Sequence, residues 1–137
     1  MRTFYGPLIC GFVLLLVACS KKPALPLSFY VMDQEVDPTR AIPTNAPTLV
    51  VSQVQAVFPE PAEGRVSIKL MPRDAAEFEK LTTDNLGKTV VVVQGTNVIS
   101  MPRITGPIPV RARIMMPIST NIDFGRTYRE LAKLKGQ

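Results

Sequence analysis

The sequence contains no histidine, no tryptophan and only two cysteines among its 137 residues. Without histidine there is no Ser-His or Cys-His nucleophile pair, no imidazole metal ligand and no imidazole that titrates near neutral pH. A hydrolase would need a Ser-Lys or paired-carboxylate site, and the sequence pattern places neither. We therefore expect a protein that is not an enzyme and that requires no metal or other cofactor.

The sequence also lacks an apolar run long enough to span a membrane. Arg2 is followed by an uncharged stretch from Phe4 to Ala18, which is shorter than the roughly 20 residues that a transmembrane helix needs. A positive charge, a short apolar centre and small residues at the end are typical of a secretory signal. We interpret residues 1–18 as a signal peptide.

The end of this stretch, Leu16-Val17-Ala18-Cys19, resembles the lipobox of bacterial lipoproteins. The resemblance implies that Cys19 is acylated, that membrane lipid is a partner, and that the protein is held in the cell envelope facing the periplasm. Ser20 is not the aspartate that typically retains lipoproteins in the inner membrane, which favours the outer membrane, whereas Lys21 and Lys22 leave this choice open. The alternatives are an ordinary signal peptide with a chance cysteine, or a buried apolar helix.

The rest of the chain divides into a tether and one domain. Residues 19–28 carry the expected lipid anchor and a proline-bearing spacer that should be extended. Residues 29–137 have the size of a single domain, for which about 100–150 residues are usual. Within it, Phe29 to Met32 is expected to form a short edge strand, and the proline-rich residues from Asp37 to Thr48 are expected to form a loop.

Hydrophobic periodicity predicts the next elements. Leu49 to Phe58 reads as one strand, and a second strand follows after a loop. A helix then begins with a capping box formed by Asp74 and Glu77 and ends before Gly87. The residues expected on the buried faces of these elements are Val50, Val54, Ala56, Phe58, Val66, Ile68, Leu70, Ala75, Phe78 and Leu81.

The pattern in the second half of the sequence predicts three further strands and a helix. The run Thr89 to Val93 suits a central strand, and Gly95-Thr96 suits a two-residue hairpin to the strand that follows. From Ile108 to Ile118 apolar residues alternate with arginines and prolines, which predicts an edge strand. The last helix is capped by Thr120 or Asn121, and its apolar stripe contains Phe124, Tyr128, Leu131 and Leu134.

The predicted order is therefore β-β-α-β-β-β-α. A mostly antiparallel β-sheet with two α-helices packed on one face would bury each of these apolar faces, which gives an α+β fold.

Two motifs at a fixed spacing carry a family resemblance. The first motif is Phe78-x-x-Leu81-Thr82-x-x-Asn85-x-Gly87-Lys88, and it precedes a valine-rich strand and a tight turn. The second motif comes directly after the turn and is Val98-Ile99-Ser100-x-Pro102. This pattern resembles the head subdomain of the first periplasmic domain of SecD, the protein-export membrane component. The resemblance covers roughly residues 48–137. It implies a binding fold, similar to one thought to hold unfolded polypeptide emerging into the periplasm.

Three features depart from the SecD pattern. The family's Asp-Gly turn is Gly95-Thr96 here, and its glycine-rich strand before the last helix is replaced by Pro107 to Pro117. SecD-like proteins carry this module between transmembrane helices that couple proton flow to export, and we find no such helices here. We therefore expect a stand-alone binding lipoprotein and not a proton-driven motor.

The motif residues also have structural explanations. Asn85 and Gly87 can end the helix while Thr82 bonds back to a carbonyl, so this motif reports the fold more than a ligand site. Ser100 is expected to be an ordinary polar residue within a strand, with no catalytic role. Three methionines could bind copper(I), pack in the core, or form an adaptable surface for peptides; they are Met101, Met115 and Met116, and only Met115 is expected to point outward.

The formal net charge of +5 does not predict a nucleic-acid partner. Much of the positive charge belongs to the last helix, with Arg126, Arg129, Lys133 and Lys135, where a solvated face is the simplest explanation. A nucleic-acid surface would interleave aromatic residues with basic ones, and an exported lipoprotein would not meet nucleic acid in the cytoplasm. A weak preference for acidic partners or headgroups remains open.

Two hypotheses of function follow from this pattern. The favoured one is capture of an extended polypeptide by strand addition along Ile108 to Ile118, where Arg111, Arg113 and Met115 would bias selection. Pro109 and Pro117 lack a donor and can protect an edge, which favours the competing hypothesis of fixed docking on one envelope protein complex. The sequence does not indicate an oligomeric state.

Overall fold

The computed structural model describes residues 24–33, 43 and 45–136. The predicted signal peptide, Cys19 and the first part of the tether lie outside these residues, as does most of the predicted loop between Asp37 and Thr48. The described part of the chain contains seven β-strands, two α-helices and a short 3-10 turn, Pro61–Glu63.

The strands form two antiparallel sheets. The larger sheet has the order β2-β1-β5-β6 and the smaller one the order β3-β4-β7. The α+β class predicted from the sequence is confirmed, although the strands make two sheets and not one. The strand bounds are Leu27–Met32 for β1, Leu49–Val51 for β2, Val54–Glu60 for β3, Arg65–Leu70 for β4, Thr89–Gln94 for β5, Asn97–Ser100 for β6 and Ile114–Pro117 for β7.

The single strand predicted from Leu49 to Phe58 is divided between the two sheets. It breaks at Ser52-Gln53, and the pairing of β3 with β4 shifts in register between Val54 and Ala56. Because such a shift reverses which side chains face inward, Val57 packs against the core and Phe58 does not. The predicted buried face was therefore wrong at Ala56 and Phe58, which lie on the other face of β3, and also at Val50, which is 45% exposed.

Strand β1 is internal and not the edge strand that the sequence suggested. It pairs with β2 on one side and with β5 on the other. It also begins at Leu27, two residues before the predicted start of the domain at Phe29. Leu27 and Phe29 are both fully buried, so the end of the predicted tether belongs to the folded body.

The valine-rich strand and its hairpin are confirmed. β5 lies between β1 and β6, and all four valines from Val90 to Val93 are buried. Gly95 has a φ of +64° in the two-residue turn to β6, a left-handed conformation that glycine adopts without steric cost. Both faces of this central strand are therefore covered.

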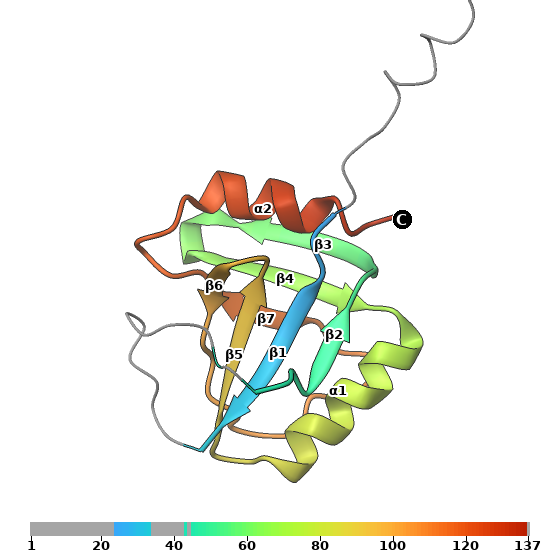
Figure 1. Cartoon of the computed structure of the whole chain (residues 1–137). Coiled ribbons are helices and arrows are strands. Elements are labelled where there is room, and N and C mark those ends of the chain that lie inside the picture. Colours follow the sequence, from blue (N-terminus) through green and yellow to red (C-terminus); the bar gives the residue numbers. More distant parts are fainter. Residues whose placement is uncertain (1–23, 34–42, 44, 137) are drawn as a thin grey trace, which may run out of the picture.

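Both sheets contribute to one hydrophobic core. Helix α1, Pro72–Asp84, contacts β2 and β4, and helix α2, Phe124–Ala132, contacts β3. The two helices lie at opposite ends of the molecule (Figure 1). The core residues with no exposed surface are Leu27, Phe29, Val51, Val66, Ile68, Met116, Leu131 and Leu134.

The helix starts differ from those predicted. Helix α1 begins at Pro72, preceded by Met71 without a side-chain cap, because proline suits the first helical position. Asp74 therefore lies inside the first turn. Helix α2 is capped by Asp123, whose carboxylate accepts a hydrogen bond of 3.1 Å from the Arg126 backbone N–H, and not by Thr120 or Asn121.

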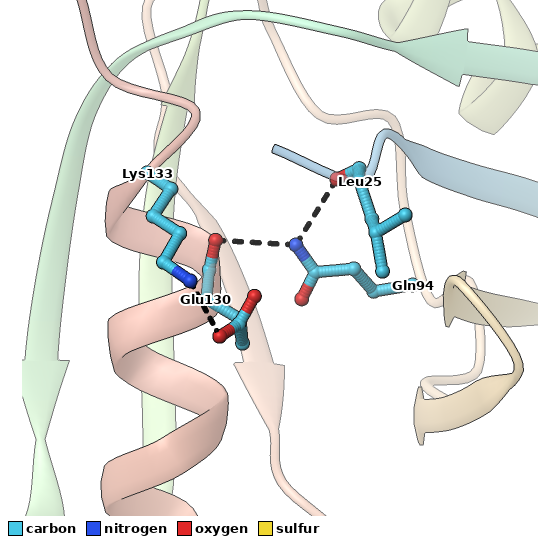
Figure 2. Close-up of polar contacts among 4 residues, drawn as sticks. All are labelled: Leu25, Gln94, Glu130 and Lys133. Atoms are coloured by element: carbon cyan, nitrogen blue, oxygen red, sulfur yellow. Dashed lines mark hydrogen bonds and ion pairs between the residues drawn. The ribbon is translucent and has the colours of Figure 1, made fainter. Parts of the chain in front are cut away.

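A buried amide joins three segments at the α2 end of the molecule. Gln94 is 4% exposed, and its Nε2 donates to the Leu25 carbonyl at 3.1 Å and to the Glu130 carbonyl at 3.2 Å (Figure 2). Leu25 also lies close to the hairpin, since a Cβ placed on Gly95 would be 2.8 Å from Leu25 Cδ1. The residues that lead into β1 are thus held against β5 and α2.

We predict that Gln94→Leu lowers the free energy of unfolding by about 1–3 kcal/mol, because two carbonyl groups lose their donor in a buried place. Urea denaturation monitored by circular dichroism measures the change. Gln55→Leu is the matched control, because Gln55 is exposed on β3, and a change within about 0.5 kcal/mol is expected there. Equal effects of the two substitutions would contradict the role of Gln94.

Candidate functional site

The segment from residue 101 to 113, which connects β6 to β7, forms no named strand. The strand predicted over Ile108 to Ile118 is therefore wrong before Ile114. Pro107 and Pro109 have no N–H to donate to a sheet. The neighbouring donors bond to α1 instead: the Ile108 N–H donates to Thr82 Oγ1 at 3.0 Å, and the Val110 N–H donates to Glu79 Oε2 at 2.8 Å.

Thr82 therefore has two roles. Its hydroxyl donates to the Glu79 carbonyl at 3.0 Å, as expected for a threonine that bonds back within a helix. Its oxygen also accepts from Ile108, which fixes the connecting segment onto α1. Sequence reasoning found the first role and missed the second, because the partner is 26 residues away along the chain.

The other motif residues end α1, as the structural explanation predicted. Asn85 Nδ2 donates to the Leu81 carbonyl at 2.8 Å, and Gly87 has a φ of +83°. The Gly87 N–H then donates to the Ile104 carbonyl, and the Ile104 N–H donates to the Lys88 carbonyl, both at 2.8 Å. These bonds hold the start of the connecting segment beside β5.

The outer face of the smaller sheet carries two large apolar side chains, the half-buried Phe58 and the exposed Met115. Phe58 and Met115 are both register partners of Ser67, one on each side of β4. Ser67 is only 1% exposed, while Met115 is 56% exposed. Met115 thus points outward as predicted, and Met116 is fully buried.

Arg113 lies over this face. Its guanidinium carbon is 3.7 Å from the centroid of the Phe58 ring, a cation–π geometry that holds the charge in a defined place. Nearby, Arg65 Nε donates to Glu60 Oε2 at 2.5 Å. This hydrogen bond is the main reason that the pKa of Glu60 is lowered from its usual value, so this carboxylate stays ionised at neutral pH and is already paired.

A surface groove of about 370 Å³ adjoins the same face. One wall is the connecting segment from Pro102 to Pro109, and α1 contributes Phe78 and Thr82. Of the three candidate peptide-binding residues, Arg113 and Met115 line the groove, whereas Arg111 is exposed and does not. The groove itself was not predicted, because it depends on the bonds between α1 and the connecting segment.

Strand β7 is an edge strand, but it offers little length for strand addition. It spans Ile114–Pro117 only. At the end of β7, the Pro117 carbonyl accepts a hydrogen bond of 2.5 Å from the buried Ser100 hydroxyl. Just after β7, the Ser119 N–H donates to the Ile99 carbonyl at 3.2 Å. Ser100 therefore behaves as a strand hydroxyl that joins β6 to β7.

No group of three His, Cys, Asp or Glu side chains in the part of the chain that the structure describes is placed to hold a metal ion. None of the helices in the same residues combines the length and the apolar character that crossing a membrane requires.

Comparisons with known proteins identify the fold. A family model described as "SecDF, P1 head subdomain" matches residues 40–121, which include the elements from β2 to β7. No sequence among curated proteins matches the chain.

Two solved structures share the architecture. One, described as a membrane component SecDF that enhances protein export, has a TM-score of 0.59 and 18% identity, and the match covers 82% of this chain and 62% of that one. The other is SecDF in a super-membrane-facing form, with a TM-score of 0.60 and 17% identity, covering 82% of this chain and 19% of that one. The chain thus spans only part of either SecDF chain.

Proposed function

Because this chain belongs to the SecDF P1 head subdomain family, we propose that it is a binding module for extended or unfolded polypeptide that acts in protein export without catalysis. The observation that carries this proposal is the groove between α1 and the connecting segment, which continues onto the face formed by Phe58 and Met115. An exposed apolar surface of this kind is typical of an interaction site.

The chemistry of the surface suits varied partners. Methionine is flexible and polarisable, and it adapts to side chains of different shape. Met115 is exposed at the edge of the groove, and Arg113 beside it offers several hydrogen-bond donors. Because β7 is short, we propose that a polypeptide lies in the groove, and that pairing with the edge of β7 contributes little.

The proposal includes a lipid anchor. Acylation of Cys19, expected from the lipobox-like sequence, would hold the domain at the periplasmic surface of a cell-envelope membrane, with the outer membrane favoured. The fatty chains would supply stable attachment at about 0.8 kcal/mol per buried methylene. Mass spectrometry of the amino-terminal peptide should find a modified Cys19, and an unmodified peptide that begins at Met1 would contradict this part of the proposal.

The alternative is a structural role, in which the same surface docks on one envelope protein complex. Pro117 favours it. It is exposed at the end of β7 and has no N–H to donate to an added strand, whereas Pro109 lies outside that strand. A folded partner would recognise the shape of the surface and would not need the free edge.

In-cell crosslinking from a photoreactive residue at position 113 separates the two functions. Many unrelated chains captured in extended form are expected for polypeptide binding, and one stoichiometric folded partner for docking. The control carries the photoreactive residue at position 126, on the exposed side of α2, at the other end of the molecule from α1 (Figure 1). Capture of lipid alone, or of the same chains from both positions, would contradict both functions.

A further inference from the structure

The groove has an uneven distribution of charge. Within the described residues, Arg103 and Arg113 are the only charged ones that line it, and no carboxylate does so. The other lining side chains are uncharged, and most of them are apolar. The groove thus combines an apolar floor with a positive rim.

Both arginines are held in position by uncharged partners. Arg113 stacks on Phe58, and Arg103 Nε donates to the Gly87 carbonyl at 3.2 Å. Among the residues that the structure describes, the three ion pairs join other side chains, so neither arginine is paired with a carboxylate there. A guanidinium has five N–H donors in a planar fork that matches a carboxylate, so each arginine retains donors for a ligand.

Two carboxylates on the flanking elements already accept hydrogen bonds from other donors. Glu60 accepts from Arg65 and Ser67, and the charge of Arg113 is only the last and smallest of the causes that lower its pKa. Glu79 Oε2 accepts from the Val110 N–H of the connecting segment. Both acidic groups therefore serve the protein's own structure. An incoming carboxylate would meet attraction at the rim and no lining carboxylate to repel it.

The volume of the groove limits what enters it. About 370 Å³ lies near the lower end of the range of roughly 300–1,000 Å³ for small-molecule pockets, which is enough for a few side chains but not for a folded element. Resting on the proposed function, we propose that the groove selects polypeptide segments in which one or two large apolar side chains are flanked by Asp or Glu.

Fluorescence anisotropy with labelled, unstructured peptides tests this selectivity. Three peptides share one apolar centre and carry Glu, Gln or Lys at both flanks. With the full mature chain at low salt we expect affinity in the order Glu, Gln, Lys, with a difference of about threefold or more at each step, as exposed ion pairs allow. Added salt should reduce the differences.

Reversing the charge of each groove arginine tests whether these side chains cause the peptide preference. Arg113→Glu and Arg103→Glu should each reduce or reverse the preference for Glu-flanked peptides, whereas Arg126→Glu on α2 should leave the order unchanged. Circular dichroism verifies the fold of each variant, and either rim variant suffices if the other does not fold. Equal binding of all three peptides, or an order that survives both rim reversals, would overturn this inference while leaving polypeptide binding intact. Failure of every peptide to bind would overturn the proposed function as well.

Discussion

Replacing Phe29 with alanine is expected to lower the free energy of unfolding by about 3–5 kcal/mol, the usual cost of truncating a buried phenylalanine. Phe29 is fully buried in β1, and its ring meets that of Phe78 edge to face, with centroids 5.3 Å apart. The substitution would remove this aromatic pair and leave a cavity between β1 and α1. Urea denaturation measures the loss.

Leu86→Ala is the control for this prediction. Leu86 is also a large apolar residue, but it is 55% exposed, so its truncation should change stability by no more than about 0.5 kcal/mol. Many small domains have a stability of only about 5–15 kcal/mol, and the Phe29 variant should therefore unfold at a much lower urea concentration. A loss below about 1 kcal/mol would contradict the central position of Phe29.

The second large effect is expected from Thr82→Val. Valine keeps the shape of the side chain but cannot accept the hydrogen bond from the Ile108 N–H. This partly buried donor would lose its partner at a cost of about 1–3 kcal/mol, and the connecting segment would separate more readily from α1. Because a ligand binds only the competent state, peptide affinity should fall roughly fivefold or more.

Thr83→Val provides a matched control for the Thr82 variant. The Thr83 hydroxyl also donates to the Glu79 carbonyl, at 2.8 Å, but it is exposed and does not contact the connecting segment through a hydrogen bond. Amide hydrogen exchange at Ile108 should accelerate in the Thr82 variant only. Unchanged exchange at Ile108, or equal loss of peptide affinity in both variants, would contradict the anchoring role of Thr82.

Local patterns in the sequence predicted much of the fold. The alternation of Val66, Ile68 and Leu70 identified β4, and the run of valines with Gly95 identified the hairpin of β5 and β6. The apolar stripe of α1 is also buried as expected. These elements could be found because their burial repeats with the period of one strand or one helix.

The errors arose where distant contacts decide the structure. The segment from residue 108 to 113 alternates like a strand, but two of its N–H groups, at positions 108 and 110, bond to Thr82 and Glu79 on α1. The register shift in β3 reversed the direction of Phe58, so its stacking with Arg113 could not be expected from simple alternation. For the candidate site, the outward direction of Met115 was predicted, whereas the groove required the placement of segments that are far apart in sequence.

The position of Gln94 has a mechanical consequence. Gln94 is at the last position of β5, where it pairs with Leu27 and bonds to Leu25. The groove lies toward the other end of β5, because it is lined by Val90 and by Arg103, which bridges to Thr89. A force between the residues before β1 and a chain held in the groove would therefore act along β1. Hydrogen bonds in an antiparallel pair are perpendicular to the strands, so such a load would shear many of them at once and would not open them one by one.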